Sequence, residues 1–287
     1  MERLTDISVI KGIMERYGFS FSKALGQNFI TNPAVCPKIA SMGGADENTG
    51  VIEIGPGFGV LTNELCRTAK KVVAIELDDR LIPILGETLA EYDNVKVINA
   101  DVMKTDLKAL IGEEFEGMDV AVCANLPYYI TTPIIMYLLE ERLPVKSVTV
   151  MVQKEAGVRI CAPLATRESG AVSFAVRYYS EPRLLFNVSR GSFMPAPDVD
   201  SCVIRLDILR EPPVKVQDEK FFFSVVRGAF SQRRKTLANS LSSALSLDKN
   251  TVNSAIAAAG LPPNVRPEQL DMESMAAVAD ALYELKL

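Results

Sequence analysis

The chain has 287 residues, of which 48% are hydrophobic and 23% charged, which is the composition of an ordinary globular protein with one large domain or two smaller ones. It contains no histidine, and this excludes Ser-His and Cys-His nucleophilic chemistry as well as metal sites with histidine ligands. The five widely spaced cysteines argue against a disulfide framework or a zinc site, and the net charge of −5 means that any nucleic-acid partner must meet a local basic patch.

The N-terminal residues predict a helix followed by a covering loop. The chain begins with charged residues and no long apolar segment follows, so we expect no signal peptide, no membrane span and a cytoplasmic location. Residues 5–17 carry apolar side chains at helical spacing and predict a short amphipathic helix. Residues 19–29 fit neither helix nor strand periodicity, and we interpret them as a loop that covers part of the protein. Asn32 and Pro33 then form a helix start signal.

From residue 50 onward the sequence alternates between strands and helices. Strands are expected at residues 51–54, 72–75, 95–99, 119–124 and 148–152, with helices at 61–68 and 80–92. This alternation predicts βαβ units and a doubly wound, mainly parallel α/β sheet. Ligands of such sheets bind beyond the carboxyl ends of the strands, which is where Gly55, Glu76, Asp101 and Asn125 stand.

The C-terminal part of the chain has a different pattern. Residues 170–187 and 199–208 are interpreted as two more strands, close enough in sequence to pair antiparallel. A proline-rich linker at 210–213 precedes helices expected at 221–230, 237–245, 249–259 and 268–285. We therefore predict a domain of residues 1–210, in which 1–32 form the N-terminal helix and covering loop, and a helical domain of residues 211–287.

A glycine-rich turn follows the first strand of the alternating region. Gly55, Gly57 and Gly59 come close to the dinucleotide-binding fingerprint, but Val60 stands where its third glycine is required. The turn therefore favours a ligand whose chain passes close over the backbone without a phosphate. A plain connection between strand and helix is the alternative.

Acidic residues mark three successive strands. Glu76 ends the second strand, where an acid can bind both ribose hydroxyls, and Asp101 ends the third, where it could accept a hydrogen bond from an adenine amine. The alternative for Glu76 is a solvated charge, which is also what we expect of the neighbouring Asp78 and Asp79. The alternative for Asp101 is a helix N-cap. Glu53 is expected to be buried and to hydrogen-bond with backbone amides. Together the acids fit S-adenosylmethionine.

The fourth strand leads into an unusual turn, Asn125-Leu126-Pro127-Tyr128. The Asn125 side-chain carbonyl can accept a hydrogen bond, and Pro127 removes a backbone donor and fixes the local chain. With the Leu126 or Pro127 carbonyl, the turn presents acceptors for both N–H bonds of an exocyclic amine whose ring stacks on Tyr128. The alternative is a proline turn with Tyr128 packed on the core.

Taken together, these motifs resemble the ribosomal RNA adenine N6-dimethyltransferase family. The resemblance rests on Glu53-Ile54-Gly55-Pro56-Gly57-Phe58-Gly59, Glu76, Asp101 and residues 125–128. Residues 25–29 (LGQNF) resemble the family's cofactor-covering loop, and residues 193–201 (FMPAPDVDS) its F-x-P-x-P-x-V-x-S segment. Residues 230–237 (FSQRRKTL) resemble the second-domain segment of the KsgA-like branch, which acts on small-subunit rRNA. The match runs from about residue 20 to the C-terminus.

The resemblance implies a Rossmann-like class I methyltransferase sheet with a smaller C-terminal helical domain, and S-adenosyl-L-methionine as the cofactor. The implied cofactor contacts are Asn28, Ile30, Gly55, Gly57, Glu76, Leu77, Asp101, Val102 and Asn125. The implied catalytic residues are Asn125, Leu126, Pro127, Tyr128 and Phe193. Tyr128 would stack on one face of the target adenine while Phe193 closes the other; a plug between the domains is the alternative for Phe193.

The resemblance also implies partners. The basic run Arg233-Arg234-Lys235, together with Arg227, would contact RNA phosphates, whereas without the resemblance it indicates a solvated helix face. The expected activity is N6-dimethylation of two adjacent adenosines near the 3′ end of 16S rRNA in the immature small subunit, with a role in subunit biogenesis. We expect a monomer that needs no metal.

Three alternatives stay open at this point. The first is the related 23S rRNA methyltransferase group that confers macrolide resistance, although the segment 232–235 favours the small-subunit branch. The second is a ribosome-assembly factor for which methylation is secondary, because binding and catalysis need the same RNA surface. The third is a DNA adenine methyltransferase, which is disfavoured because we find no motif that reads a DNA sequence.

Overall fold

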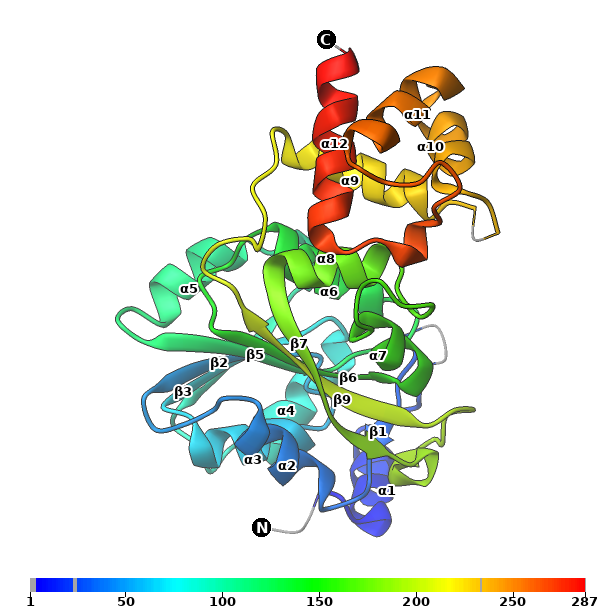
Figure 1. The fold of residues 1–287 in the computed structure, drawn as a ribbon. Coiled ribbons are helices and arrows are strands. Elements are labelled where there is room, and N and C mark those ends of the chain that lie inside the picture. The colour runs from blue at the N-terminus through cyan, green and yellow to red at the C-terminus, as the bar shows by residue number, and fades with distance from the viewer. Residues whose placement is uncertain (1–3, 23–24, 233, 287) are drawn as a thin grey trace. The chain divides into compact units, whose positions relative to one another are not determined.

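The computed structural model describes the chain except residues 1–3, 23–24, 233 and 287 (Figure 1). Contacts divide it into two compact units: Met1–Gly157 with Pro182–Ile208, and Val158–Glu181 with Leu209–Leu287. The predicted domains, 1–210 and 211–287, differ from these units in the segments 158–181 and 209–210, which group with the C-terminal helices. In the part of the chain that the structure describes, no helix has the length and apolarity that a membrane span needs.

A mixed seven-stranded sheet forms the centre of the first unit, in the order β4-β3-β2-β5-β6-β9-β7. Its strands are β2 (Thr49–Ile54), β3 (Lys71–Glu76), β4 (Val95–Asn99), β5 (Asp119–Asn125), β6 (Ser147–Gln153), β7 (Ser180–Val188) and β9 (Ser201–Ile208). Strands β2 to β6 pair in parallel, and β9 runs antiparallel to β6. This confirms the predicted doubly wound, mainly parallel sheet.

Helices cover both faces of this sheet, with α2 and α3 on one face and α5 and α6 on the other (Figure 1). The helices of the first unit are α1 (Ile7–Arg16), α2 (Val35–Met42), α3 (Val60–Thr68), α4 (Ile82–Thr88), α5 (Leu107–Glu114) and α6 (Thr131–Glu140); α7 (Lys154–Ile160) spans the division between the units. Short 3-10 turns stand at η1 (Asp79–Leu81), η2 (Val102–Lys104) and η3 (Arg190–Ser192), and two-residue strands at β1 (Phe29–Ile30) and β8 (Phe193–Met194). Because both faces are covered, the central strands β2, β5 and β6 are buried along most of their length, whereas the edge strand β4 is partly exposed.

The second unit is helical and corrects one prediction. Its helices are α8 (Ala171–Tyr179), α9 (Glu219–Ala229), α10 (Leu237–Leu245), α11 (Lys249–Ala258) and α12 (Met272–Lys286), with a 3-10 turn η4 (Pro267–Gln269). The strand predicted over 170–187 is therefore wrong for its first half, which forms α8. A continuous apolar run does not by itself distinguish a strand from a buried helix. Here packing decides, because the Tyr178 and Tyr179 rings of α8 lie 5.1 and 5.5 Å from the Phe223 ring of α9.

One carboxyl is buried inside the sheet of the first unit. Glu53 on β2 is 1% exposed, and its Oε2 has no hydrogen-bond partner among the described residues, so this atom does not make the expected bond to a backbone amide. Burial raises the pKa of Glu53 to about 8, and the nearby charge of Glu76 acts in the same direction. The carboxyl therefore holds its proton at neutral pH.

Replacement Glu53→Gln should make the free energy of unfolding less dependent on pH. The folded protein keeps the Glu53 proton up to about pH 8, whereas the unfolded chain releases it near the ordinary pKa of 4.5. The wild type therefore loses stability as the pH rises through this window, and the amide variant does not lose this contribution. Urea unfolding of both proteins at several pH values tests this. A stability difference that is the same at both ends of the window would contradict it.

Candidate active site

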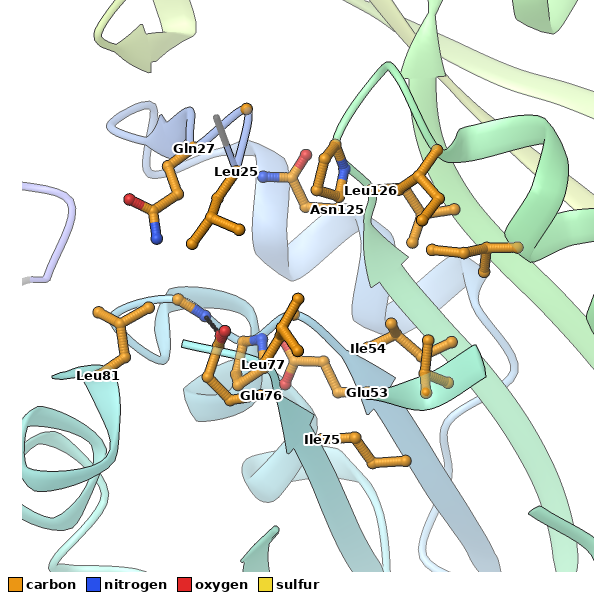
Figure 2. Close-up of a pocket in the computed structure, with 18 of the residues that line it drawn as sticks. Leu25, Gln27, Glu53, Ile54, Ile75, Glu76, Leu77, Leu81, Asn125 and Leu126 are labelled. Atoms are coloured by element: carbon orange, nitrogen blue, oxygen red, sulfur yellow. Dashed lines mark hydrogen bonds between the residues drawn. The ribbon is translucent and has the colours of Figure 1, made fainter. Parts of the chain in front are cut away.

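One pocket lies at the carboxyl ends of β2, β3 and β5 (Figure 2). The parallel register sets these ends level, because Ile54 pairs with Ile75 on β3 and with Ala124 on β5. Every residue predicted to bind the cofactor lines this pocket: Asn28, Ile30, Gly55, Gly57, Glu76, Leu77, Asp101, Val102 and Asn125. Leu126, Pro127 and Tyr128 line it as well. The fold thus brings the separate motifs to one place.

The glycine turn after β2 forms one wall of the pocket. Gly57 has a φ of +61°, and a Cβ at this position would lie 2.8 Å from Cε1 of Phe29, so the turn requires glycine here. Gly55 also has a positive φ, of +70°, but no atom lies within 4 Å of where its Cβ would stand. The backbone at Gly55 is therefore open for a ligand to approach closely.

Glu76 at the end of β3 is only 6% exposed, so it is not a solvated charge. Its Oε2 accepts a hydrogen bond from the Gly57 N–H at 3.2 Å, and its Oε1 accepts one from the Asp78 N–H at 2.8 Å. Burial raises the pKa of Glu76, while these backbone hydrogen bonds act against the rise. The carboxylate is thus fixed by two backbone donors while it lines the pocket.

Asp101 begins the turn η2 that follows β4. Its Oδ1 accepts a hydrogen bond from the Met103 N–H at 3.0 Å, which confirms the N-cap that we weighed for it. Its Oδ2 lies 3.6 Å from Nζ of Lys104, and the residue lines the pocket at the same time. Val102, the next residue in the chain, is buried. Leu77, which follows β3, is 54% exposed although its side chain is apolar.

The covering segment, residues 25–30, lies across the pocket from Glu53 and Glu76, as Figure 2 shows for Leu25 and Gln27. Within it β1 pairs antiparallel with β8, so that Ile30 lies opposite Phe193. Of the covering loop predicted over residues 19–29, residues 25–29 line the pocket, and the strand pairing of β1 was not predicted from the sequence. The Asn125 side chain also holds the segment, because its Nδ2 donates to the Asn28 backbone oxygen at 3.1 Å.

The two backbone carbonyls of the turn after β5 differ in whether they already accept hydrogen bonds. The Pro127 carbonyl already accepts two hydrogen bonds, from the Ile130 N–H at 3.2 Å and from Oγ1 of Thr131 at 3.1 Å. For the Leu126 carbonyl we find no donor among the described residues. A carbonyl has two lone pairs. Of the two backbone acceptors that the sequence suggested, Leu126 is therefore the one that can receive an amine.

The two aromatic residues predicted to hold the target base differ in their surroundings. Tyr128 lines the pocket, its hydroxyl lies 2.6 Å from Oγ of Ser201, and burial raises its pKa. Phe193 is 5% exposed and packs in the core of the first unit, and it does not line the pocket. The role of Phe193 against a base stays a prediction.

The residues predicted to contact RNA belong to the second unit. Arg227 is exposed in the last turn of α9, and Arg234 and Lys235 are exposed in the turn before α10. Arg233 lies outside the described residues. RNA contact by this group stays a prediction.

Two of the pocket-lining residues that were not among the predicted site residues carry polar or aromatic side chains, Tyr129 and Gln27. Tyr129 lines the pocket and is 60% exposed, and its signal was an aromatic residue directly after the 125–128 turn. Gln27 also lines the pocket, and its Nε2 donates to Oδ2 of Asp78 at 2.7 Å.

The expectation that Asp78 is solvated is wrong, since it is 6% exposed. The Arg80 guanidinium beside it lowers the pKa of the Asp78 carboxyl.

Comparison with known proteins agrees with this geometry. The family model for "ribosomal RNA adenine dimethylase" matches residues 18–283. A "ribosomal RNA small subunit methyltransferase A" of Geobacillus thermodenitrificans is 51% identical over 96% of this chain and 95% of its own length. One of Bacillus mycoides with the same name is 50% identical over 96% of both chains.

Two solved structures share the fold. A dimethyladenosine transferase from Plasmodium falciparum superposes with a TM-score of 0.72 at 25% identity, over 90% of this chain and 98% of that one. The 23S rRNA methyltransferase ErmE gives a TM-score of 0.68, also at 25% identity, over 89% of this chain and 100% of that one. With its pocket, its motifs and these matches, the chain belongs to the ribosomal RNA adenine dimethylase family and is an S-adenosylmethionine-dependent rRNA adenine dimethyltransferase.

Proposed function

We propose that this chain dimethylates N6 of two adjacent adenosines near the 3′ end of 16S rRNA on immature small ribosomal subunits, and thereby takes part in subunit biogenesis. We further propose that it acts as a monomer in the cytoplasm. We choose the small subunit because the chain is 51% and 50% identical in sequence to two relatives named for it. Its identity to a 23S rRNA methyltransferase is 25%.

The pocket residues fit S-adenosylmethionine. Glu53 Oε2 is a buried oxygen without a partner in the described part of the chain, and on this neutral carboxyl it suits an N–H-bearing group of the cofactor. Glu76, fixed by two backbone donors, suits the ribose hydroxyls, and Asp101 suits the adenine amine. Leu77 and Val102 offer apolar surface to the flat ring, while Asn28 and Ile30 approach from the covering segment. When bound, this cofactor supplies an electrophilic methyl group on a sulfonium.

The chain's contribution to transfer is to orient a poor nucleophile. The lone pair of an adenine N6 amine is delocalised into the ring, and acceptors that hold both N–H bonds favour a pyramidal nitrogen whose lone pair is available. We assign these acceptors to Oδ1 of Asn125 and to the Leu126 carbonyl. The Asn125 Nδ2 is already engaged with the Asn28 oxygen, which leaves Oδ1 for the amine. Such orientation and preorganised dipoles are typically worth several kcal/mol in enzymes.

The target base has to leave its stack before it can reach the pocket, and aromatic faces offset part of that cost. Tyr128 lines the pocket beside the acceptors, and its hydroxyl contact with Ser201 fixes the ring. We therefore assign the stacking face to Tyr128. Closure of the other face by Phe193 is a weaker proposal, because Phe193 would have to leave its buried site.

A second candidate function is assembly of the small subunit with methylation secondary. The exposed cations Arg227, Arg234 and Lys235 support RNA binding in either case, since they would contact phosphates whether or not transfer occurs. An inactive Asn125 variant separates the two, because it would rescue subunit maturation in cells that lack the enzyme only if binding suffices.

Labelled methyl transfer should identify the substrate. We expect purified small subunits from cells without this dimethylation to acquire label as N6,N6-dimethyladenosine, because the relatives named for the small subunit share half of their residues with this chain. Large subunits from cells without their own adenine methylation serve as the comparison. Label confined to the large subunits would move the protein to the macrolide-resistance group.

Replacement Asn125→Ala should lower the transfer rate by at least about 100-fold, the usual cost of removing one preorganised polar group, with a cofactor Kd within about fivefold of wild type. Single-turnover transfer and calorimetric cofactor titration measure the two effects. Asn94→Ala is the matched control, since Asn94 Nδ2 also donates to backbone oxygens, at 2.9 and 3.0 Å, and Asn94 does not line the pocket. Equal losses in cofactor affinity and transfer rate would contradict the assignment.

Replacing Arg227, Arg234 and Lys235 by glutamine should weaken binding to small subunits and flatten its salt dependence. Each phosphate contact that is lost should reduce the slope of log K against log salt by about 0.7 to 0.9. A filter-binding titration at several salt concentrations measures both quantities. Replacing three other exposed lysines, Lys11, Lys70 and Lys215, controls for net charge. An unchanged slope in the first variant would refute the patch.

A further inference from the structure

Two consecutive residues of the covering segment, Gln27 and Asn28, form hydrogen bonds with residues at the ends of two different strands. On one side Gln27 Nε2 donates to Oδ2 of Asp78, beyond β3, at 2.7 Å. On the other side the Asn28 backbone oxygen accepts from Nδ2 of Asn125, at the end of β5, at 3.1 Å. Residues 25–30 therefore bridge the turn beside Glu76 and the proposed catalytic amide.

Both ends of the Gln27 side chain are engaged. Its Oε1 accepts a hydrogen bond from the Ser22 N–H at 2.8 Å, while its Nε2 reaches Asp78. The bond to Asp78 is charge-assisted, and its acceptor is 6% exposed, so water competes for it weakly. This is the kind of side-chain hydrogen bond that can hold a segment in place.

Asp78 is a rigid anchor for this bond. Its carboxylate also accepts from Arg80, with Nε at 2.8 Å from Oδ1 and an Nη at 2.6 Å from Oδ2. The Arg80 guanidinium in turn lies 5.0 Å from the centre of the Phe19 ring. The backbone N–H of Asp78 donates to Oε1 of Glu76. Asp78 thus connects the proposed ribose-binding carboxylate to the covering segment.

The other attachment determines which way the Asn125 amide faces. A backbone oxygen only accepts hydrogen bonds, so the Asn28 oxygen selects Nδ2 as its partner and leaves Oδ1 facing away from it. If the Asn28 oxygen moved away, the amide could rotate and present its N–H groups to the substrate amine, which is itself a donor. The position of residue 28 therefore controls the acceptor that transfer requires.

From these contacts we infer that Gln27 is a positioning residue: its hydrogen bond with Asp78 latches residues 25–30 over the pocket, so that the Asn28 oxygen holds the Asn125 amide in the orientation that accepts the adenine amine. The inference rests on the proposed role of Asn125. It gives the covering segment a part in methyl transfer itself, in addition to cofactor contact.

Gln27→Met tests the latch, because methionine keeps the length of the side chain but can neither donate to Asp78 nor replace the amide at Ser22. We expect kcat at saturating cofactor and saturating small subunits to fall about tenfold, the factor that corresponds to one charge-assisted hydrogen bond. Hydrogen exchange of the backbone amides of residues 25–30 should speed up in the ligand-free protein. Gln217→Met is the matched control, since Gln217 donates to the Glu284 carboxylate at 2.8 Å in the other unit.

A second variant adds a readout that a merely structural role would not move. Gln27→Glu keeps an acceptor for the Ser22 N–H but sets a carboxylate against Asp78, so at pH 8 its kcat should lie below that of Gln27→Met. Two facing carboxyls can share a proton, which restores a donor. The activity of Gln27→Glu relative to wild type should therefore rise as the pH falls from about 8 to about 5.5.

The possible results of these experiments test the role of Gln27 separately from the proposed function. An unchanged kcat with a higher cofactor KM in Gln27→Met would overturn the inference, because it would confine the segment to cofactor binding. Faster exchange with unchanged kcat would overturn it too, since the latch would then not orient Asn125. If the wild type transfers no methyl group to small subunits, the proposed function fails instead. The exchange of residues 25–30 then decides the latch alone, and equal rates in wild type and Gln27→Met would overturn it.

Discussion

The parallel pairing of β2 with β3 and with β5 is the constraint on which the rest of the active site depends. Backbone hydrogen bonds hold Ile54 level with Ile75 and Ala124, and so the next residues along each strand meet at one edge of the sheet. A slip by one residue would turn side chains to the opposite face of the sheet. The glycine turn, Glu76 and Asn125 come from three distant parts of the sequence, and they line one pocket only because this register is fixed.

Two buried acidic residues, Glu53 and Glu76, line the pocket. Glu53 and Glu76 are both nearly inaccessible, and burial raises the pKa of each because it disfavours the charged form. Asp78 differs, because Arg80 and Gln27 pair with it and its pKa falls. Two neighbouring acids on one strand end thus serve different purposes. Glu76 lines the pocket and accepts only backbone donors among the described residues, while Asp78 accepts side-chain hydrogen bonds from Gln27 and Arg80.

The strands and site motifs of the first unit could be predicted because local rules and tertiary packing agree there. Apolar runs bounded by polar residues or glycine predicted β2 to β6, and Gly55, Glu76, Asp101 and Asn125 were placed correctly at strand ends. The prediction failed where packing overrides local preference. Residues 171–179 are rich in aromatic and β-branched types, yet they form α8, because their rings pack on α9. Helix α4 also ends at Thr88, before the predicted residue 92.

By itself the sequence determined the parallel strands β2 to β6, the positions of the turns at their ends and the family, since periodicity, glycine positions and motif residues are local properties. Only the tertiary structure decided that Asp78 is buried, that Ile30 pairs with Phe193, and that the Pro127 carbonyl is occupied while that of Leu126 has no donor among the described residues. These facts depend on contacts between residues far apart in the chain. Burial and hydrogen-bond partners arise from such contacts, and no spacing along the sequence encodes them.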